Sequence, residues 1–246
     1  MKPFMVIGHR GAMGHAPENT RAAFVRGLSL GADAVECDVH LSKDGELVVI
    51  HDGSLDRTTN GSGPVRAHPW KALRDLDAGG WFGDRFRGER LWRLSDLLAW
   101  AKSKRTRAGR LLQVIVEIKD KPVAYPGIEN KIVATLRRAG MVRRSFVISF
   151  DHDGVGRIKR RCPSVRAGLL FSERPADLIR RMARTRAEAV FPRHTLINAD
   201  FMALARQRGW FVGTWTANAP ADLSRLAELG VDAVATNYPE RARAVR

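Results

Sequence analysis

The chain has 246 residues, 44% of them hydrophobic, which suits one large domain with a buried core. Its net charge of +16 excludes an acidic protein, and its two cysteines argue against a disulfide framework. The apolar runs are shorter than the roughly 20 residues of a membrane-spanning helix, and the first residues lack a signal-peptide cleavage site, so we expect a cytoplasmic protein.

Strand-like and helix-like patterns alternate from the first residues to the last. Strands are predicted at 4–8, 33–39, 46–51, 112–118, 145–150, 165–171, 187–191, 210–215 and 231–236. Helices are predicted at 19–30, 95–104, 128–139, 152–161, 175–185, 199–208 and 219–229. This alternation predicts an α/β fold with a mostly parallel sheet covered by helices, and the length suits an eight-stranded barrel in a single domain, 1–246.

The second and third predicted strands are joined by a hairpin signal, which explains why one strand more is predicted than a barrel needs. If Asp44 and Gly45 are the two loop residues, Asp38 lies directly opposite His51, within ~5.5 Å at Cβ. Glu36 is two residues before Asp38 and therefore shares its face. The register predicts a cluster of Glu36, Asp38 and His51.

The segment at about 54–94 interrupts the alternation. It is rich in glycine and aromatic residues and shows no clear long helix. Loops that follow the carboxyl ends of barrel strands build the functional site. We therefore interpret this segment as a small insertion folded over the barrel mouth.

Several predicted strands end on ionisable residues. An unpaired buried charge is expensive, so repeated charged strand ends indicate one polar site shared by the carboxyl ends of parallel strands. The residues concerned are His9, Arg10, Glu36, Asp38, His51, Glu117 and Lys119.

Three of these residues are carboxylates that suit a metal ion. Glu36, Asp38 and Glu117 offer hard oxygen ligands, which favour Mg²⁺ or Ca²⁺ over zinc. Without a cation, three clustered carboxylates would repel one another and raise their own pKa values. The alternative is a set of salt bridges between the barrel rim and the many arginines.

The remaining candidates suit acid–base chemistry on a phosphate. His9 and His51 titrate near neutral pH and form a candidate acid–base pair. Arg10 offers a planar fork for phosphate oxygens, and Lys119 points into the same site as Glu117. Trp215 either lines the mouth, where it would stack on an apolar part of the substrate, or closes the barrel.

The positive charge is spread along the chain. Most basic residues lie on predicted helices without the interleaved aromatics of a single-strand nucleic-acid groove, so no nucleic-acid partner is expected. A solvated basic surface and attraction to anionic substrates or membrane surfaces both remain open.

An ordered set of motifs resembles the glycerophosphodiester phosphodiesterase family. By pattern alone, residues 17–20 form an ordinary helix cap, with Asn19 or Thr20 as the capping residue. The set as a whole is far more specific. Its members are His9-Arg10-Gly11, Pro17-Glu18-Asn19-Thr20, Glu36-x-Asp38-Val39, Lys43-Asp44-Gly45, His51-Asp52, 55–61, Glu117-Ile118-Lys119, Trp215-Thr216-x-Asn218 and Thr236-Asn237-x-Pro239.

The resemblance implies a TIM-type (β/α)8 barrel that cleaves glycerophosphodiesters to an alcohol and sn-glycerol 3-phosphate. It implies a divalent cation on the three carboxylates, His9 and His51 as general acid and base, and Arg10 and Lys119 on the phosphate. The implied route is attack of a glycerol hydroxyl on phosphorus, followed by hydrolysis of the cyclic phosphate.

Three functions remain in competition. The expected one is hydrolysis of small diesters such as glycerophosphocholine. The second is a lysophospholipase D-like activity at membranes, with the aromatic insertion and basic surface contacting a lipid headgroup. The third is a non-catalytic barrel that binds a phosphate ligand, which the presence of both histidines and all three acids disfavours.

Overall fold

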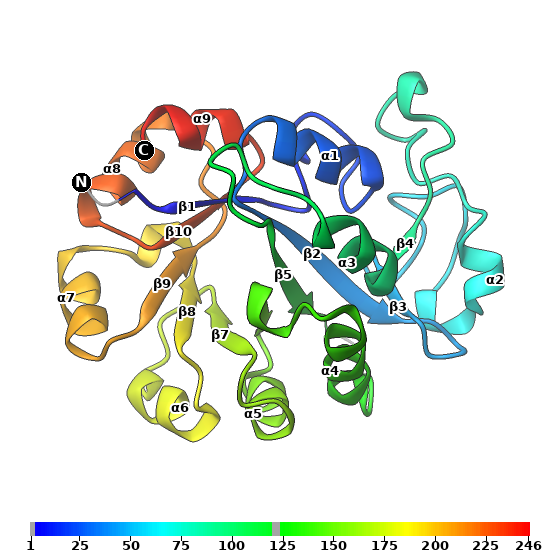
Figure 1. Cartoon of the computed structure of the whole chain (residues 1–246). Helices are drawn as coiled ribbons and strands as arrows, with labels where there is room; N and C mark the ends of the chain where they lie inside the picture. The colour runs from blue at the N-terminus through cyan, green and yellow to red at the C-terminus, as the bar shows by residue number, and fades with distance from the viewer. Residues whose placement is uncertain (1–2, 120–123) are drawn as a thin grey trace.

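Parallel strands close into a barrel in the computed structural model, which describes residues 3–119 and 124–246 (Figure 1). Eight of the described strands follow the order β1-β10-β9-β8-β7-β6-β5-β2, and β2 pairs with β1 to close the ring. The predicted (β/α)8 barrel is thereby confirmed. The barrel strands are β1 (Met5–Gly8), β2 (Ala34–Leu41), β5 (Gln113–Ile118), β6 (Ser145–Ser149), β7 (Arg166–Phe171), β8 (Ala189–Pro192), β9 (Phe211–Thr214) and β10 (Ala233–Thr236).

Helices surround the barrel and bury their apolar faces against it (Figure 1). Thr20 caps the first of them, since its side chain accepts from the backbone N–H of Ala23. None of the described helices is long and apolar enough to cross a membrane. The helices are α1 (Arg21–Ser29), α3 (Leu94–Lys102), α4 (Ile128–Ala139), α5 (His152–Arg161), α6 (Leu178–Thr185), α7 (Ala199–Gln207), α8 (Pro220–Leu229) and α9 (Pro239–Ala244).

Strand β2 is long enough to pair both within the closed barrel and with an antiparallel extension of the same sheet. Its first residues pair with β1 and its first six with β5, whereas its last three pair with the antiparallel strand β3 (Leu47–Val49). The short strand β4 (Trp92–Arg93) continues this extension beyond β3. The hairpin therefore projects from the barrel and lies outside its closed ring.

The predicted register of this hairpin is wrong by one residue. Val39 pairs with Val49, and the backbone N–H of Ile50 donates to the carbonyl of Asp38, so Asp38 faces Ile50 instead of His51. The loop has three residues, 43–45. Ser42 and Glu46, on either side of it, hydrogen-bond to each other. Gly45, with a φ of 80°, allows this longer loop.

The insertion packs beside the hairpin. It contains the short helices η1 (Val65–Ala67), α2 (Trp70–Leu73) and η2 (Asp84–Phe86), coloured cyan to blue-green in Figure 1. Its own apolar cluster includes two hairpin residues, Val48 and Ile50. It also contacts the first turn of helix α1, where Glu89 accepts from the backbone N–H of Ala22. The insertion thus lies along one side of the barrel mouth.

The interior of the barrel is apolar below the mouth. Phe146 and Phe191 fill it with their rings 6.0 Å apart, and Gly168 and Gly213 leave room for Phe191, because a Cβ at either would lie under 3 Å from its ring. This packed apolar layer fills the barrel below the carboxyl ends of the strands.

Candidate active site

A cavity of about 130 Å³ opens at the carboxyl ends of the strands. One wall is apolar and includes Ile115, Ile148 and Leu170. The other wall is ionisable. The sequence-predicted residues that line the cavity are His9, Arg10, Glu36, His51, Glu117, Lys119 and Trp215. The described lining includes no residue of the insertion at 54–94.

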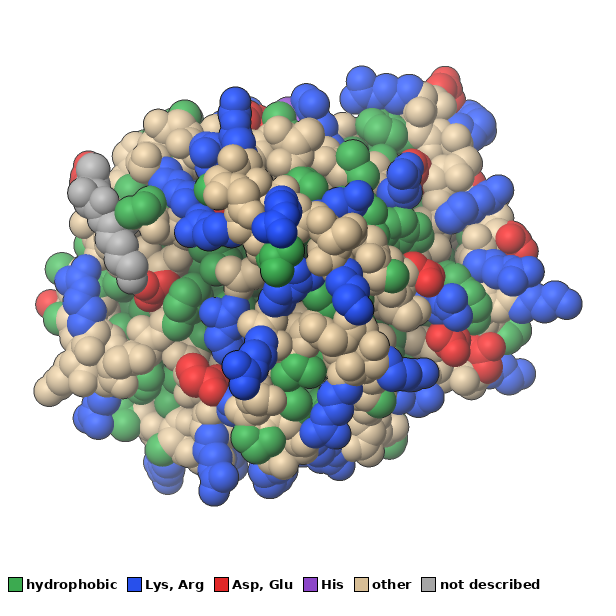
Figure 2. Space-filling view, in the orientation of Figure 1, with side chains coloured by type: hydrophobic (Ala, Val, Ile, Leu, Met, Phe, Trp, Pro, Cys, Tyr) green, Lys and Arg blue, Asp and Glu red, His purple; other side chains and the backbone are tan. Residues whose placement is uncertain are grey.

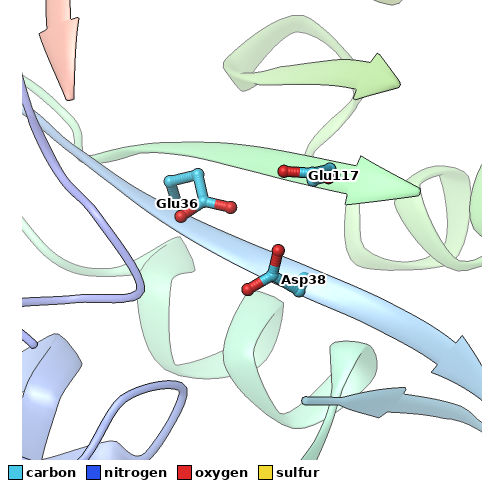
Figure 3. A group of neighbouring side chains, drawn as sticks. All are labelled: Glu36, Asp38 and Glu117. Carbon is cyan, nitrogen blue, oxygen red and sulfur yellow. The ribbon is translucent and has the colours of Figure 1, made fainter. Parts of the chain in front are cut away.

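Three buried carboxylates meet beside this cavity, as predicted (Figure 3). Glu36 and Asp38 project from β2, and Glu117 lies on β5 directly across from Asp38. One oxygen from each lies within 4.8 Å of the others. Oxygen Oε1 of Glu36 is buried and has no hydrogen-bond partner among the described residues.

The three carboxylates ionise differently. Burial and repulsion from Asp38 raise the pKa of Glu117 to about 7, and the same causes raise the pKa of Glu36 well above its ordinary value. Burial also opposes ionisation of Asp38, but Lys119 and Arg10 outweigh it and hold the pKa of that carboxyl below its usual range. Lys119 and Arg10 offset this cost only in part for Glu117, and Arg10 offsets it only in part for Glu36.

This donor set fits a divalent cation. All three groups are hard oxygen donors, they converge from two adjacent strands, and one oxygen lacks any other described partner. A cation would add positive charge beside Glu36 and Glu117 and so favour their ionised forms.

Arg10 and Lys119 contact different oxygens of Asp38. The Lys119 Nζ lies 3.1 Å from Oδ1 of Asp38 and donates to Oε1 of Glu117 at 2.5 Å. The Arg10 Nε lies 3.3 Å from Oδ2 of Asp38, and its NH1 donates to Glu18 at 2.8 Å. Asp38 thus orients both cations that face the cavity.

The backbone of Arg10 adopts a costly conformation. Its φ is 48°, in the left-handed region that side chains other than glycine rarely occupy. Two bonds hold it there: its N–H donates to Oε2 of Glu36, and its carbonyl accepts from the N–H of Asn19. Asn19, also left-handed at φ 60°, bonds to Asp38 through its side chain. Such strain concentrates at functional sites.

His9 and His51 are each held through Nδ1. The Nδ1 of His9 lies 2.8 Å from Oδ1 of Asn237, and the Nδ1 of His51 lies 2.6 Å from Oδ1 of Asp52. With Nδ1 assigned as the donor in both rings, Nε2 is the nitrogen available for proton transfer. Burial, with Arg10 nearby, lowers the pKa of His9 to about 4, and burial also lowers the pKa of His51.

His51 reaches the cavity although the register places it off the face of Asp38. Strand β3 ends at Val49, so the chain leaves the sheet before His51. The ring of His40 lies 2.9 Å from the carbonyl of His51 through Nε2 and 2.9 Å from the hydroxyl of Tyr125 through Nδ1. The end of the strand and this bond therefore place His51, rather than cross-strand pairing.

Trp215 is fixed by its own hydrogen bond. Its Nε1 donates to the carbonyl of Phe191 at 2.8 Å, and its ring meets Phe150 edge to face at 5.6 Å. Trp215 thus lines the mouth, the first of the two predicted alternatives.

The prediction missed several residues that position the others. Glu18, Asn19, Asp52, Arg57 and Asn237 bond directly to predicted site residues or to their partners. All five lie in the motifs that carry the family resemblance, which was the available signal. A sequence motif does not say which side chains contact each other, however, and residues 17–20 also fit an ordinary helix cap.

Comparison with known proteins relates the whole chain to one family. The model described as "Glycerophosphoryl diester phosphodiesterase family" matches residues 9–241. A protein of Caldanaerobacter subterraneus subsp. tengcongensis named glycerophosphodiester phosphodiesterase is 36% identical over 236 residues, which cover 96% of this chain and 95% of the relative.

Solved structures agree with the sequence match. The crystal structure of glycerophosphodiester phosphodiesterase from Agrobacterium tumefaciens strain C58 has a TM-score of 0.84 at 31% identity, covering 98% of this chain and 100% of that one. A phosphodiesterase of Oleispira antarctica, solved in complex with the product sn-glycerol-3-phosphate, has a TM-score of 0.84 at 26% identity, covering 98% and 96%.

Proposed function

The chain belongs to the glycerophosphoryl diester phosphodiesterase family and is a phosphoric diester hydrolase, and on this premise we propose a metal-dependent reaction with two histidines as acid and base. The substrates would be small glycerophosphodiesters, and the products an alcohol and sn-glycerol 3-phosphate. The observation that carries the proposal is the buried carboxylate triad beside two imidazoles that line the same cavity.

Glu36, Asp38 and Glu117 would hold the cation, Mg²⁺ or Ca²⁺. Bound there, it would neutralise charge on the phosphoryl oxygens and acidify the attacking hydroxyl. Arg10 and Lys119 would bind the phosphate from the two sides of Asp38. Both stay protonated, because Asp38 raises the pKa of each despite burial.

The two histidines would exchange one proton each with the substrate. Their lowered pKa values leave both rings neutral at pH 7, so either Nε2 can accept the proton of the attacking glycerol hydroxyl. The other ring takes a proton from solvent before the reaction and donates it to the oxygen of the leaving alcohol. When water opens the cyclic phosphate, this ring accepts a proton from the water, and the first ring returns its proton to the glycerol hydroxyl. Asn237 and Asp52, each bonded to Nδ1, would keep the rings aimed through this exchange.

Product analysis over a panel of diesters tests the proposal. Glycerophosphocholine, glycerophosphoethanolamine and lysophosphatidylcholine are incubated with the enzyme, and sn-glycerol 3-phosphate and its acylated form are quantified. We expect hydrolysis that EDTA abolishes and that Mg²⁺ or Ca²⁺ restores. Full turnover in the chelator would contradict metal dependence, and binding of these diesters without any product would favour the non-catalytic alternative.

A specific surface favours lysophospholipase D-like activity as the second candidate. Trp81 is 42% exposed and meets Phe82 edge to face, and Phe82 in turn meets Phe86. The neighbouring Arg85 lies over the ring of Phe86 and contacts the carbonyl of His15 in the β1–α1 loop. Exposed aromatics beside arginines suit the surface of an anionic membrane.

The basic side chains add to this attraction without forming one patch. Figure 2 shows Lys and Arg spread over the face in view, with fewer acidic side chains between them. We propose a cytoplasmic enzyme with peripheral contact to the membrane. Binding to phosphatidylglycerol vesicles that weakens in salt and in Trp81→Ala, with faster cleavage of lysophosphatidylcholine than of glycerophosphocholine, would support this candidate.

A further inference from the structure

Arg57 lies outside the cavity but bonds to two of the carboxylates around it. Its Nε donates to Oδ2 of Asp52 at 2.6 Å. Its NH1 and NH2 donate to Oε2 and Oε1 of Glu18 at 2.9 and 2.8 Å. Arg57 is not among the described residues that line the cavity. It is therefore placed to act through its partners.

Each of the two carboxylates that Arg57 contacts also bonds to a residue that lines the cavity. Asp52 uses Oδ2 for Arg57 and Oδ1 for Nδ1 of His51. Glu18 is only 5% exposed and shares Oε1 between Arg57 and NH1 of Arg10. One guanidinium thus joins His51, from the end of β3, to Arg10, from the end of β1.

We propose that Arg57 is a positioning residue that fixes the positions of the His51 and Arg10 side chains relative to each other at the cavity. This inference rests on the proposed function. The insertion that contributes Arg57 is then part of the catalytic apparatus, although its described residues do not line the cavity. Arg57 acts on the geometry of the site, because its planar guanidinium has fixed donor directions and constrains the carboxylates of Asp52 and Glu18 at once.

The contacts of Asp52 and Glu18 explain why an arginine is needed at position 57. Without Arg57, one oxygen of Asp52 loses its partner, and the carboxylate is free to turn away from Nδ1 of His51. Glu18, buried beside Arg10, would then rely on Arg10 alone and draw that guanidinium toward itself. A lysine at position 57 would keep the positive charge but has a single ammonium group. That group cannot make the two hydrogen bonds to Glu18 and the one to Asp52 that the guanidinium makes.

A purely structural role predicts a different outcome. If Arg57 only fastened the insertion to the barrel, its loss would lower the unfolding temperature and leave kcat of the folded enzyme unchanged. If it positions His51 and Arg10, kcat falls in protein that remains folded, since a misplacement of about 1 Å can cost about 10²-fold.

The experiment compares Arg57→Ala and Arg57→Lys with a matched control. Arg74→Ala removes an exposed ion pair with Asp75 from the same insertion. We measure kcat and KM for glycerophosphocholine together with thermal unfolding. We expect kcat to fall about 10²-fold in Arg57→Ala and about tenfold in Arg57→Lys, while Arg74→Ala stays at the wild-type value.

Chemical rescue separates positioning from folding. The Arg57 side chain is 44% exposed, so methylguanidinium can reach the vacated place in Arg57→Ala. It should restore part of kcat there and none in Arg74→Ala, and methylammonium should do less. The Arg57→Ala and Asp52→Asn losses in kcat should also fail to add, because both break one chain of contacts.

Wild-type kcat in folded Arg57→Ala, or in Arg57→Lys if the alanine variant does not fold, would overturn the inference. So would additive losses with Asp52→Asn. A wild-type enzyme that cleaves no glycerophosphodiester would instead overturn the proposed function, and the inference with it.

Discussion

The backbone N–H of Arg10 donates to Oε2 of Glu36 at 2.9 Å, which leaves Oε1 of Glu36 as the buried oxygen without a partner among the described residues. Glu36→Gln keeps the shape of the side chain and removes its charge. We expect the affinity for Mg²⁺ or Ca²⁺ to fall by about 10²-fold, because a carboxylate beside the cation contributes several kcal/mol. Isothermal titration calorimetry measures it.

The same variant should be more stable than the wild type when both are metal-free at alkaline pH. The raised pKa of Glu36 means that its ionised form costs the folded state free energy, and glutamine removes that cost. Glu173→Gln, on an exposed residue, is the control for both measurements. Unchanged metal affinity in Glu36→Gln would contradict the assignment of Glu36 as a ligand.

Metal affinity should rise with pH through neutrality. Burial and Asp38 raise the pKa of Glu117 to about 7, so a cation must displace a proton from this carboxyl at lower pH. Calorimetry from about pH 6 to about pH 8 should show tighter binding at the higher pH, with protons released to the buffer. Affinity that does not change across this range would contradict the raised pKa.

Stability of the metal-free protein should show the opposite trend. A carboxyl whose pKa is raised on folding stabilises the folded state below its ordinary pKa, and this contribution is lost as pH rises through the folded value. For Glu117 the loss extends to about pH 7. The gain in unfolding temperature on adding Mg²⁺ should accordingly be larger at pH 8 than at pH 6.

Loss of either histidine should stop turnover while leaving metal binding intact. We expect His9→Ala and His51→Ala each to lower kcat by at least ~10² if the rings transfer protons. His68→Ala is the control, because His68 lies in the insertion and bonds to the carbonyl of Ser62. Near-normal kcat in either test variant, measured with glycerophosphocholine, would remove that residue from the proposed pair.

Gly11 should be intolerant of any side chain. Its φ is 89°, and a Cβ would lie 2.4 Å from the backbone carbon of Ala23 in α1. We expect Gly11→Ala to lower the free energy of unfolding by about 3 kcal/mol or more, from strain and overpacking together. Gly109→Ala is the matched control, with a φ of 76° and nothing within 4 Å. Urea unfolding of both variants separates the clash from the cost of the backbone angle.

The barrel and most of the site could be predicted because both depend on local signals. Buried parallel strands are apolar runs, and a charged residue at the end of such a run stands out. Glu36, Asp38, Glu117 and Lys119 were found in this way. Glu117 and Lys119 lie at the end of β5, whereas Glu36 and Asp38 lie inside β2, which continues past the barrel into the hairpin. Their mutual approach follows from the barrel alone.

The hairpin register could not be predicted, since it depends on contacts made at a distance. Asp44 accepts from the hydroxyl of Ser42 and from the backbone N–H of Trp70 in the insertion, which favours the three-residue loop. Arg57 was missed for the same reason: it meets Glu18 from 39 positions away. The left-handed backbone of Arg10 has no sequence pattern that predicts it.

The hairpin that leaves the closed ring has a consequence for how the protein would lose activity. His9 follows β1, which is paired on both sides within the barrel, whereas His51 follows a three-residue strand bordered outside the ring by the two-residue β4. Elements with so few backbone bonds open by local fluctuation well below the global unfolding free energy. Amide hydrogens around β3 should then exchange sooner than those of β1, and mild denaturant should inactivate the enzyme while the barrel remains folded.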